Sequence, residues 1–502
     1  MERGLFILFM YWQFWQKIPH FTIAQGGSLA LDDPVDCTER MTRSTTHDGL
    51  ANPNPTPYAK GLKRGLSEEL VRRMSAEKGE PLWMIEHRLQ CLRLFRKFTL
   101  PTWGPDLSAL DFDRILFYAS PGVAQTDDWA EVPEDIRRVY ERLGIPQAEY
   151  QMLGGAGAQY ESDVIYHRLK EEWEERGVLF LDMDEALRTY PDLVREHFMR
   201  CVRPTDHAFA ALHGAVWSGG TFLYVPSGVT VFEPLQSYFR MNARGMGQFE
   251  HTMIIIEEGA QAHYIEGCSA PKYGSPSLHA GCVEIFVKPG ARMRYSSVEN
   301  WSQDTYNLNT KRAIVEREAT MEWVGGNLGS GVTMLYPCSV LTGEAASCEH
   351  LGLAMAGKNQ WQDTGAKVIH LAPHTSSVVI SKSVSRDGGR TVYRGLLKVA
   401  PEAKDTTASI QCDALLLDAK SSTATVPDLQ IGTDDATIAH EATVGKLSEE
   451  DLFYAMSRGL SEPEAKTMIV RGFVEPIMQQ IPLEYAVEMN RLIEMEMEGS
   501  VG

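Results

Sequence analysis

Residues 283–298 read VEIFVKPGARMRYSSV: an apolar run, a Pro-Gly turn and a second run that alternates apolar and polar residues. Short runs of β-branched and aromatic residues bounded by Pro and Gly are typical of β-strands. The stretch therefore predicts a strand, a sharp turn and a second strand. The same plan recurs on both sides of it, in residues 222–232, 253–265, 313–324, 339–351, 367–381 and 396–410.

The spacing of these seven copies is nearly constant. Successive turns end 32, 31, 28, 26, 30 and 28 residues apart, at Gly228, Ala260, Ala291, Ala319, Ala345, Thr375 and Ala403. Such a period indicates a solenoid in which each copy buries its apolar face on the next. Because no helix separates the strands, we expect a β-helix with about one coil per copy. A β-sandwich is the alternative, but its strand spacing, usually about 8–12 residues, is less regular over long distances.

Helical patterns flank the repeats. On the N-terminal side, Ser67 and Gly79 are the expected N-cap and stop of a first helix. Three more helices are predicted over 81–98, 134–145 and 161–178. On the C-terminal side, Ser448 and Ser461 begin helices that Gly459 and Gly472 are expected to end. The last amphipathic helix carries residues that suit either a core or a partner surface: Met489, Leu492, Ile493 and Met495.

These patterns divide the chain into four parts. We expect a leader or start-site extension over 1–56, an N-terminal helical domain over 57–177, a β-helix over 178–440 and a C-terminal helical domain over 441–502. The apolar run at 4–15 is shorter than the roughly 20 residues that span a bilayer. It has the length of a signal-peptide core, but Glu2 weakens the basic start. We favour an upstream extension, with Met41 as the true start.

Composition narrows the class of function. The 502 residues carry a net charge of −19, which argues against nonspecific binding to nucleic acid or to an anionic membrane. The eight cysteines are scattered and form no C-x-x-C pair, which suits a reducing, cytoplasmic compartment better than a disulfide scaffold. The sequence has no G-x-x-x-x-G-K-[ST] loop, so we expect no nucleotide hydrolysis by this chain.

Two cysteines stand out by their surroundings. Cys268 lies between Gly267 and Ser-Ala-Pro, and on spacing alone it is more often structural than reactive. Cys412 is isolated, with His440 and Glu441 following 28 and 29 residues later, about one repeat step. Strands of adjacent coils lie about 4.8 Å apart, so either residue could lie beside Cys412. Neighbours in a strand point to opposite faces, and the sequence leaves open which of the two shares its face.

Nine ordered blocks carry a resemblance to a known family. They run from GEPLWMIEHRL (79–89) and FLYVPSGV (222–229) to the long stretch HEATVGKLSEEDLFYAMSRGL (440–460). The other six are YFRMNARGMGQFEHT (238–252), YIEGCSAP (264–271), NTKRA (309–313), QDTGAKVIHLAPHTSSVVISKSVS (362–385), YRGLLKVAP (393–401) and QCDALLLD (411–418). From about Tyr58 to its end, the chain resembles the SufB branch of the SufB/SufD family, scaffold subunits of the SufBCD iron–sulfur cluster assembly complex.

The resemblance implies a mainly β fold, a right-handed parallel β-helix flanked by helical domains, and a scaffold that is not an enzyme. It implies as partners the ATPase SufC, docked by the C-terminal helices, SufD, a cysteine desulfurase with its sulfur-shuttle protein, and apo iron–sulfur acceptor proteins. It implies that Cys268 accepts persulfide sulfur and Cys412 receives it. The matching path residues are Arg240, Asn242, Glu299, Trp301 and Lys311. Cys412, Glu441 and His440 match the nascent-cluster site, expected to hold a transient 4Fe-4S cluster.

The resemblance places Arg240 and Lys311 on the sulfur path, and we expect a nearby cation of this kind to favour the attacking thiolate. Two features depart from the family pattern: residues 117–129 lack the cysteine cluster of some members, and Glu299 stands where glutamine is common. Some family complexes bind reduced FAD, but no flavin motif is visible. A SufD-type subunit is the nearest alternative, although such chains lack the cysteine of EGCSAP. A polysaccharide-active β-helix enzyme is a further alternative, but the repeats show no row of carboxylates.

Overall fold

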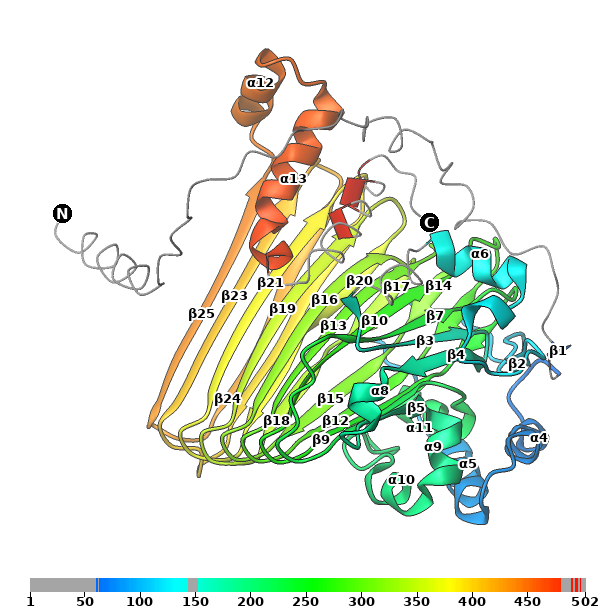
Figure 1. Cartoon of the computed structure of the whole chain (residues 1–502). Coiled ribbons are helices and arrows are strands. Elements are labelled where there is room, and N and C mark those ends of the chain that lie inside the picture. The colour runs from blue at the N-terminus through cyan, green and yellow to red at the C-terminus, as the bar shows by residue number, and fades with distance from the viewer. Residues whose placement is uncertain are drawn as a thin grey trace, which may run out of the picture. The chain divides into compact units, whose positions relative to one another are not determined.

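The computed structural model describes residues 60–61, 63–142, 152–479, 489–490, 493–494 and 497 (Figure 1). The predicted leader or extension at 1–56 lies outside the described residues. Most of the described chain forms a parallel β-solenoid of about eight coils, which confirms the predicted β-helix with helices in its N- and C-terminal regions. No helix in the described ranges is both long and apolar enough to cross a membrane.

Two sheets build the solenoid. The first sheet has ten strands, which pair in the order β25 (Ala436–Lys446), β23 (Thr406–Leu416), β21 (Ser376–Ser385), β19 (Ser347–Ala356), β16 (Thr320–Gly329), β13 (Arg292–Trp301), β10 (Gln261–Ser269), β7 (Leu235–Arg240), β3 (Gly155–Tyr160) and β4 (Asp163–Leu169). All these pairs are parallel except β3 with β4, which is antiparallel. From β3 to β25 the strand order follows the chain order, as stacked coils require, and β4 lies at the edge beside β3.

The second sheet is interrupted in its early coils and continuous in its late ones. Its long strands are β20 (Trp361–His370), β22 (Arg390–Val399) and β24 (Ser422–Ile431). In earlier coils two shorter strands take the place of one: β8 (Gly247–Gln248) and β9 (His251–Ile256), β11 (Ser277–His279) and β12 (Cys282–Val287), β14 (Thr305–Asn307) and β15 (Thr310–Val315), β17 (Val332–Leu335) and β18 (Cys338–Leu341). The antiparallel pair β5 (Leu179–Asp182) and β6 (Thr221–Val225) extends this sheet beside β9.

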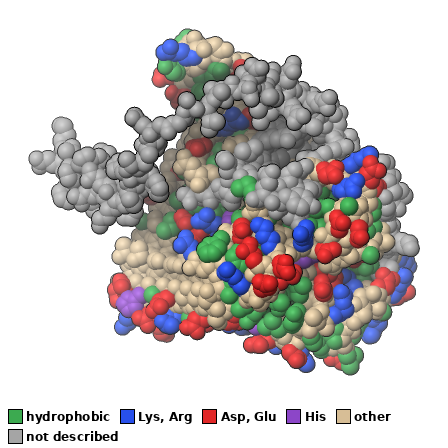
Figure 2. Space-filling model, viewed as in Figure 1, with side chains coloured by type: hydrophobic (Ala, Val, Ile, Leu, Met, Phe, Trp, Pro, Cys, Tyr) green, Lys and Arg blue, Asp and Glu red, His purple; other side chains and the backbone are tan. Residues whose placement is uncertain are grey.

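The turns that lead from the second sheet to the first, here called corners, confirm the repeated turn. In most coils the corner residue lies one position before the turn residue predicted from the sequence. The corner residues have positive φ angles near 60° and are Gly228, Gly259, Gly290, Glu318, Ala345 and His374. Each corner N–H donates to a carbonyl one coil on, as from Gly259 to the Pro289 oxygen at 2.9 Å. Charged side chains gather along these corners, at the lower edge of the view in Figure 2. These corner hydrogen bonds join successive coils in addition to the hydrogen bonds between the strands.

Helices cover the early coils. They are α4 (Glu68–Lys78), α5 (Leu82–Phe95), α6 (Glu134–Arg142), α8 (Glu171–Glu174), α9 (Met183–Thr189), α10 (Pro191–His197) and α11 (Ala208–Val216), with a 3₁₀ turn at Trp129–Glu131 and a small sheet of β1 (Lys60–Gly61) and β2 (Ala119–Ser120). The caps of α4 are as predicted: the Ser67 hydroxyl accepts from the Leu70 N–H, and Gly79 adopts φ 64°. The helix predicted over 161–178 is wrong for its first half, where strand β4 forms and buries Ile165 and Tyr166 beside β3; within this range only α8 is helical.

Two helices follow the last strand, α12 (Glu449–Ser457) and α13 (Glu462–Met478). Ser448 caps α12 and Ser461 forms a capping box with Glu464, as predicted. The predicted stop at Gly472 is wrong, since α13 continues for six residues beyond it. Burial of its apolar face on the first sheet outweighs the low helix propensity of glycine. This packing joins α13 and the last described residues to strands of the solenoid: Val470, Val474, Ile477, Met489 and Ile493 with Val324, Leu351 and Leu353.

Candidate functional site

Three parallel rows of side chains line the inner face of the first sheet, and two of them contain the predicted cysteines. Strand register aligns every second residue of one coil with its counterpart in the next. The middle row runs through Ser237, Glu266, Ser297, Gly325, Gly352, Ser381, Cys412 and Ala442. A flanking row runs through Phe239, Cys268, Glu299, Asn327, Ala354, Ser383 and Ala414. Cys268 and Cys412 therefore share one face of one sheet, five strand steps or about 24 Å apart.

Cys268 lies in a buried, charged environment. Its residue on β10 aligns with Glu299 on the next coil, and both are at most 1% exposed. The Lys311 ammonium reaches across from the second sheet, with Nζ 2.7 Å from Glu299 Oε1 and 3.3 Å from Glu266 Oε1. Lys311 also lies 5.0 Å from the centre of the Tyr295 ring. Three ionisable side chains thus surround the thiol in a space without solvent contact.

This environment keeps Cys268 protonated at rest. Burial raises the pKa of Cys268 well above its ordinary value, and the carboxylates of Glu266 and Glu299 raise it further. Lys311 opposes this rise without cancelling it. Lys311 favours the thiolate, as expected of a nearby cation, but burial and the carboxylates together outweigh it. Burial also raises the pKa of Glu266, so this carboxyl can hold a proton near neutral pH more readily than an exposed one.

A second polar chain joins this environment and was not predicted from the sequence. His279 Nε2 lies 2.5 Å from Glu250 Oε1, and its Nδ1 lies 2.9 Å from Asn307 Oδ1. The Asn307 amide in turn donates to Glu299. The 28-residue step from His279 to Asn307 is one coil, which is the signal that could have paired them.

The remaining predicted path residues divide into two groups. Trp301 packs with Cys268 in one apolar cluster, and its ring lies 4.2 Å from that of His279, centre to centre. Arg240 aligns with Ser269 and donates to its hydroxyl at 3.0 Å, so it points to the sheet face opposite Cys268. The backbone N–H of Asn242 donates to Glu161 Oε2 at 3.1 Å. The structure thus brings Cys268, Glu299, Trp301 and Lys311 together and places Arg240 across the sheet from them.

In the middle row, on the last coil but one, Cys412 is 4% exposed and its Sγ lies 3.9 Å from His440 Nε2. Burial raises the pKa of Cys412 to about 12, a rise that the Tyr393 hydroxyl reduces. The register settles which neighbour shares its face. Cys412 aligns with Ala442, a step of 30 residues, so His440 lies diagonally on the same face. Glu441 aligns with Gln411 on the opposite face and is exposed.

A narrow cavity occupies the solenoid between these two ends. Its volume is about 50 Å³, which is room for roughly three or four water molecules. Lys311 and Ser297 line one end, and Ser381 and Tyr393 line the other. Gly325 and Gly352 form its middle, and a Cβ added at Gly352 would meet no atom within 4 Å. The glycines therefore leave free volume that a side chain would fill.

Comparison with known proteins agrees with this geometry. Residues 239–473 match the family described as "SUF system FeS cluster assembly, SufBD core domain", and residues 159–237 match the SufBD protein N-terminal region. The chain is 51% identical over 440 residues to the iron–sulfur cluster assembly protein SufB of Bacillus subtilis, covering 88% of this chain and 95% of that protein. It is 52% identical, with the same coverage, to an iron–sulfur cluster assembly SufBD family protein of Staphylococcus epidermidis.

Proposed function

The chain belongs to the SufBD family of iron–sulfur cluster assembly proteins, and from that premise we propose that it is a cluster scaffold which moves sulfur from Cys268 to Cys412. The observation that carries the proposal is that the two thiols lie in adjacent rows on one inner face of the first sheet, with a cavity among the coils between them. On this proposal the chain is a scaffold rather than an enzyme, and it works in the cytoplasm.

The first step is thiol–persulfide exchange. The Cys268 thiolate attacks the outer sulfur of a donor persulfide, one S–S bond breaks as another forms, and the donor leaves as a thiolate. The proton that Cys268 loses needs an acceptor, and Glu266 has the raised pKa and the position on the same face for this role. About 24 Å separates the two thiols, so Cys412 cannot attack the Cys268 persulfide directly. We propose that hydrosulfide carries the sulfur: it takes the outer sulfur of the Cys268 persulfide as HSS⁻, which leaves Cys268 as a thiolate, and the Cys412 thiolate then takes that sulfur from HSS⁻ and releases hydrosulfide.

At the far end, Cys412 and His440 supply one sulfur and one nitrogen ligand to the nascent cluster, which is the chain's cargo. Soft thiolate with imidazole suits iron–sulfur chemistry. Glu441 joins them only if the last strand twists, because it lies on the other face of β25. We propose a 4Fe-4S cluster here. Reduced FAD, which some complexes of the family bind, has no matching motif in this chain.

Two surfaces support the proposed partners. The last coil leaves apolar side chains exposed on β24 and β25: Val426, Leu429, Ile431 and Val444. Exposed edges of long strands are usually covered, and we propose that SufD covers this one and shares the cluster site. On α12, Phe453 is 75% exposed and Tyr454 is 61% exposed. We propose this helix as the docking site of SufC, whose ATP hydrolysis opens the interface between this chain and SufD. We further propose that a cysteine desulfurase and its sulfur-shuttle protein deliver the sulfur. Apo iron–sulfur proteins then receive the finished cluster.

The test blocks the cavity without touching either thiol. Gly352→Leu places a branched side chain in the middle of the path, and Gly352→Ala is the matched control because its Cβ meets nothing. Both variants are supplied with a persulfide donor, and persulfides on the two cysteines are mapped by mass spectrometry. We expect Gly352→Leu to carry a persulfide on Cys268 but not on Cys412, and Gly352→Ala to carry both. Equal labelling of Cys412 in the two variants would refute an internal path.

Anaerobic reconstitution with iron and sulfide tests the end point separately. We expect wild type to develop the absorbance of a cluster and Cys412→Ser to lose it. Normal cluster maturation by Cys412→Ser in cells would refute the role of this thiol. A purely structural subunit would bind neither iron nor sulfide in either form.

A further inference from the structure

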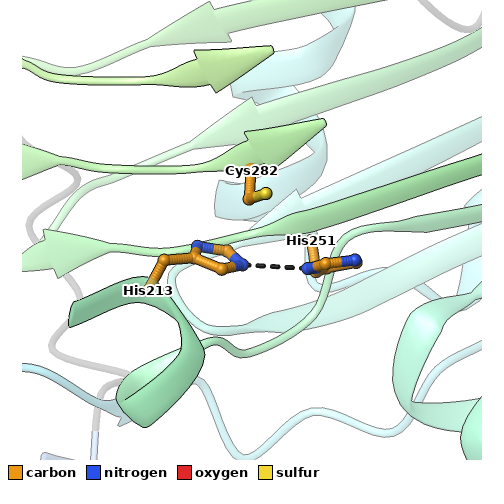
Figure 3. A group of neighbouring side chains, drawn as sticks. All are labelled: His213, His251 and Cys282. Atoms are coloured by element: carbon orange, nitrogen blue, oxygen red, sulfur yellow. Dashed lines mark hydrogen bonds between the residues drawn. The ribbon is translucent and has the colours of Figure 1, made fainter. Parts of the chain in front are cut away.

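Two imidazoles and one thiol meet on the outer face of the second sheet, away from the sulfur path. His213 lies in α11, His251 begins β9 and Cys282 begins β12 (Figure 3). Their potential ligand atoms all lie within 4.8 Å of one another. Each residue is at most 1% exposed. Three segments far apart in the sequence thus place three metal-ligand side chains at one buried point.

The sheet itself separates this cluster from the proposed path. His251 and Cys282 are register partners, so their side chains share a face. Strand alternation puts Ile254 and Val283 on the other face, where they join the interior core. Met253 instead joins the apolar cluster under the N-terminal helices. The cluster therefore belongs to the helix-covered outer face and faces neither Cys268 nor Cys412.

Neighbouring polar groups position both histidines for coordination. His213 Nδ1 lies 3.0 Å from the Ala280 carbonyl, which can only accept, so Nδ1 carries the proton. A neutral His213 then presents the Nε2 lone pair to His251 Nδ1, 2.9 Å away. On its far side, His251 Nε2 lies 3.2 Å from Glu284 Oε2. A carbonyl behind one imidazole and a carboxylate behind the other are the partners that orient metal-bound histidines in proteins.

Glu284 is itself held firmly. Its two oxygens accept from the backbone N–H groups of Met199, Cys201 and Val202 at 2.6 to 2.8 Å. The rings of Phe198 and Trp217 pack on His251. The held carboxylate and the two rings fix the position of His251, as the outer partners of metal-bound histidines do.

The geometry points to a buried site for one divalent metal ion of zinc type, bound by His213 Nε2, His251 Nδ1 and Cys282 Sγ. Two imidazoles and a thiolate suit zinc better than hard cations such as Mg²⁺ or Ca²⁺. Tetrahedral Zn–N bonds of about 2.0–2.1 Å place two nitrogens about 3.3 Å apart, a few tenths of an ångström wider than the present pair. On binding, Cys282 releases its proton, and the His251 proton moves from Nδ1 to Nε2 beside Glu284.

The test measures metal in the full chain with both sulfur-path thiols removed, as Cys268→Ser with Cys412→Ser, and without a polyhistidine tag. Cells are grown with added zinc, because a site without solvent contact should fill as the chain folds. The purified protein is dialysed against a chelator, and its metal is counted by elemental analysis before and after unfolding in guanidinium. We expect about one zinc per chain, retained while folded and released on unfolding.

Variants locate the metal. We expect Cys282→Ser and His213→Gln to reduce retained zinc at least tenfold, while Cys348→Ser, which changes another buried free cysteine outside the cluster, retains it. Growth in cobalt gives a second readout, a thiolate-to-cobalt charge-transfer band that Cys282→Ser should abolish. Folded parent protein without zinc would overturn the site and leave a structural hydrogen-bonded histidine pair. Zinc that survives both cluster variants would equally overturn it. Neither result bears on sulfur transfer, since both path thiols are absent.

Discussion

Lys311→Met should destabilise the protein by about 3–5 kcal/mol at neutral pH, the usual cost of removing one partner of a buried ion pair. The ammonium is 1% exposed and lies within 3.3 Å of two carboxylates that are equally buried. Without it, Glu266 and Glu299 stay close together with no cation between them. Methionine keeps the length and apolar stem of the side chain, so the loss reports charge rather than volume.

The pH dependence separates this explanation from a packing defect. Burial opposes ionisation of Glu299, but Lys311, His279 and Asn307 together outweigh burial and lower the pKa of Glu299 in the folded wild type. That stabilisation exists above the unfolded pKa, about 4.3, and disappears as the pH falls through the folded value. In Lys311→Met we expect the folded pKa of Glu299 to rise above the unfolded value and the pKa of Glu266, already raised by burial, to rise further, so each carboxyl costs more stability as pH increases. The gap between wild type and variant should therefore be small near pH 5 and largest near pH 8.

Urea unfolding at pH 5, 6.5 and 8, followed by circular dichroism, measures this gap. Lys288→Met is the matched control, since Lys288 pairs with Glu316 at 3.1 Å on the surface and should contribute less than about 1 kcal/mol. Adding Glu299→Gln to Lys311→Met should recover part of the loss. The reasoning is refuted if Lys311→Met costs no more than Lys288→Met, or if its cost is the same at pH 5 and pH 8.

Three further predictions concern corners, a helix and a thiol. Ala345→Gly should stabilise the chain by about 1 kcal/mol, because Ala345 has φ 58°, a conformation that glycine adopts without strain. Gly290→Ala should cost about as much, because Gly290 has φ 65°, although an added Cβ would meet no atom. Urea midpoints that do not move in opposite directions for the two variants would contradict this. Gly472→Ala should stabilise α13 by about 0.5–1 kcal/mol, seen as slower amide exchange in that helix, since its Cβ also meets nothing. Alkylation of Cys412 should accelerate about tenfold per pH unit up to pH 10 because its pKa is raised to about 12, and a plateau below pH 9 would contradict that environment.

The fold could be predicted from the sequence because a local pattern of residues specifies it and repeats along the chain. A strand, a turn and a strand recur every 26 to 32 residues, and stacking such units has few physical solutions. Local chemistry also predicted the helix caps at Ser67, Ser448 and Ser461. Predictions failed where tertiary contacts outweighed local preference. Residues 161–178 have a helical composition, yet Tyr166 pairs with β3 and Ile165 is buried in the same apolar cluster.

The site was only partly open to prediction, because coil length varies. A 28-residue step suggested His440 and Glu441 as neighbours of Cys412, but the coil between them has 30 residues, so Ala442 is the aligned residue. Each residue added to or removed from a coil changes which side chains of the next strand face the interior. The pKa direction of Cys268 was equally hidden, because Glu266 and Glu299 reach it only through strand pairing. The roles of the predicted site residues stay predictions.

The stacked coils make the separation of Cys268 and Cys412 a matter of counting. Aligned residues in successive coils are 27 to 31 positions apart, yet each coil adds the same rise of about 4.8 Å. Residues inserted or deleted at a corner would change the length of the chain and leave the distance between the thiols unchanged. Removing one complete coil would shorten it by one fixed increment. The solenoid is in this sense a molecular ruler, graduated in whole coils and indifferent to the sequence length of each.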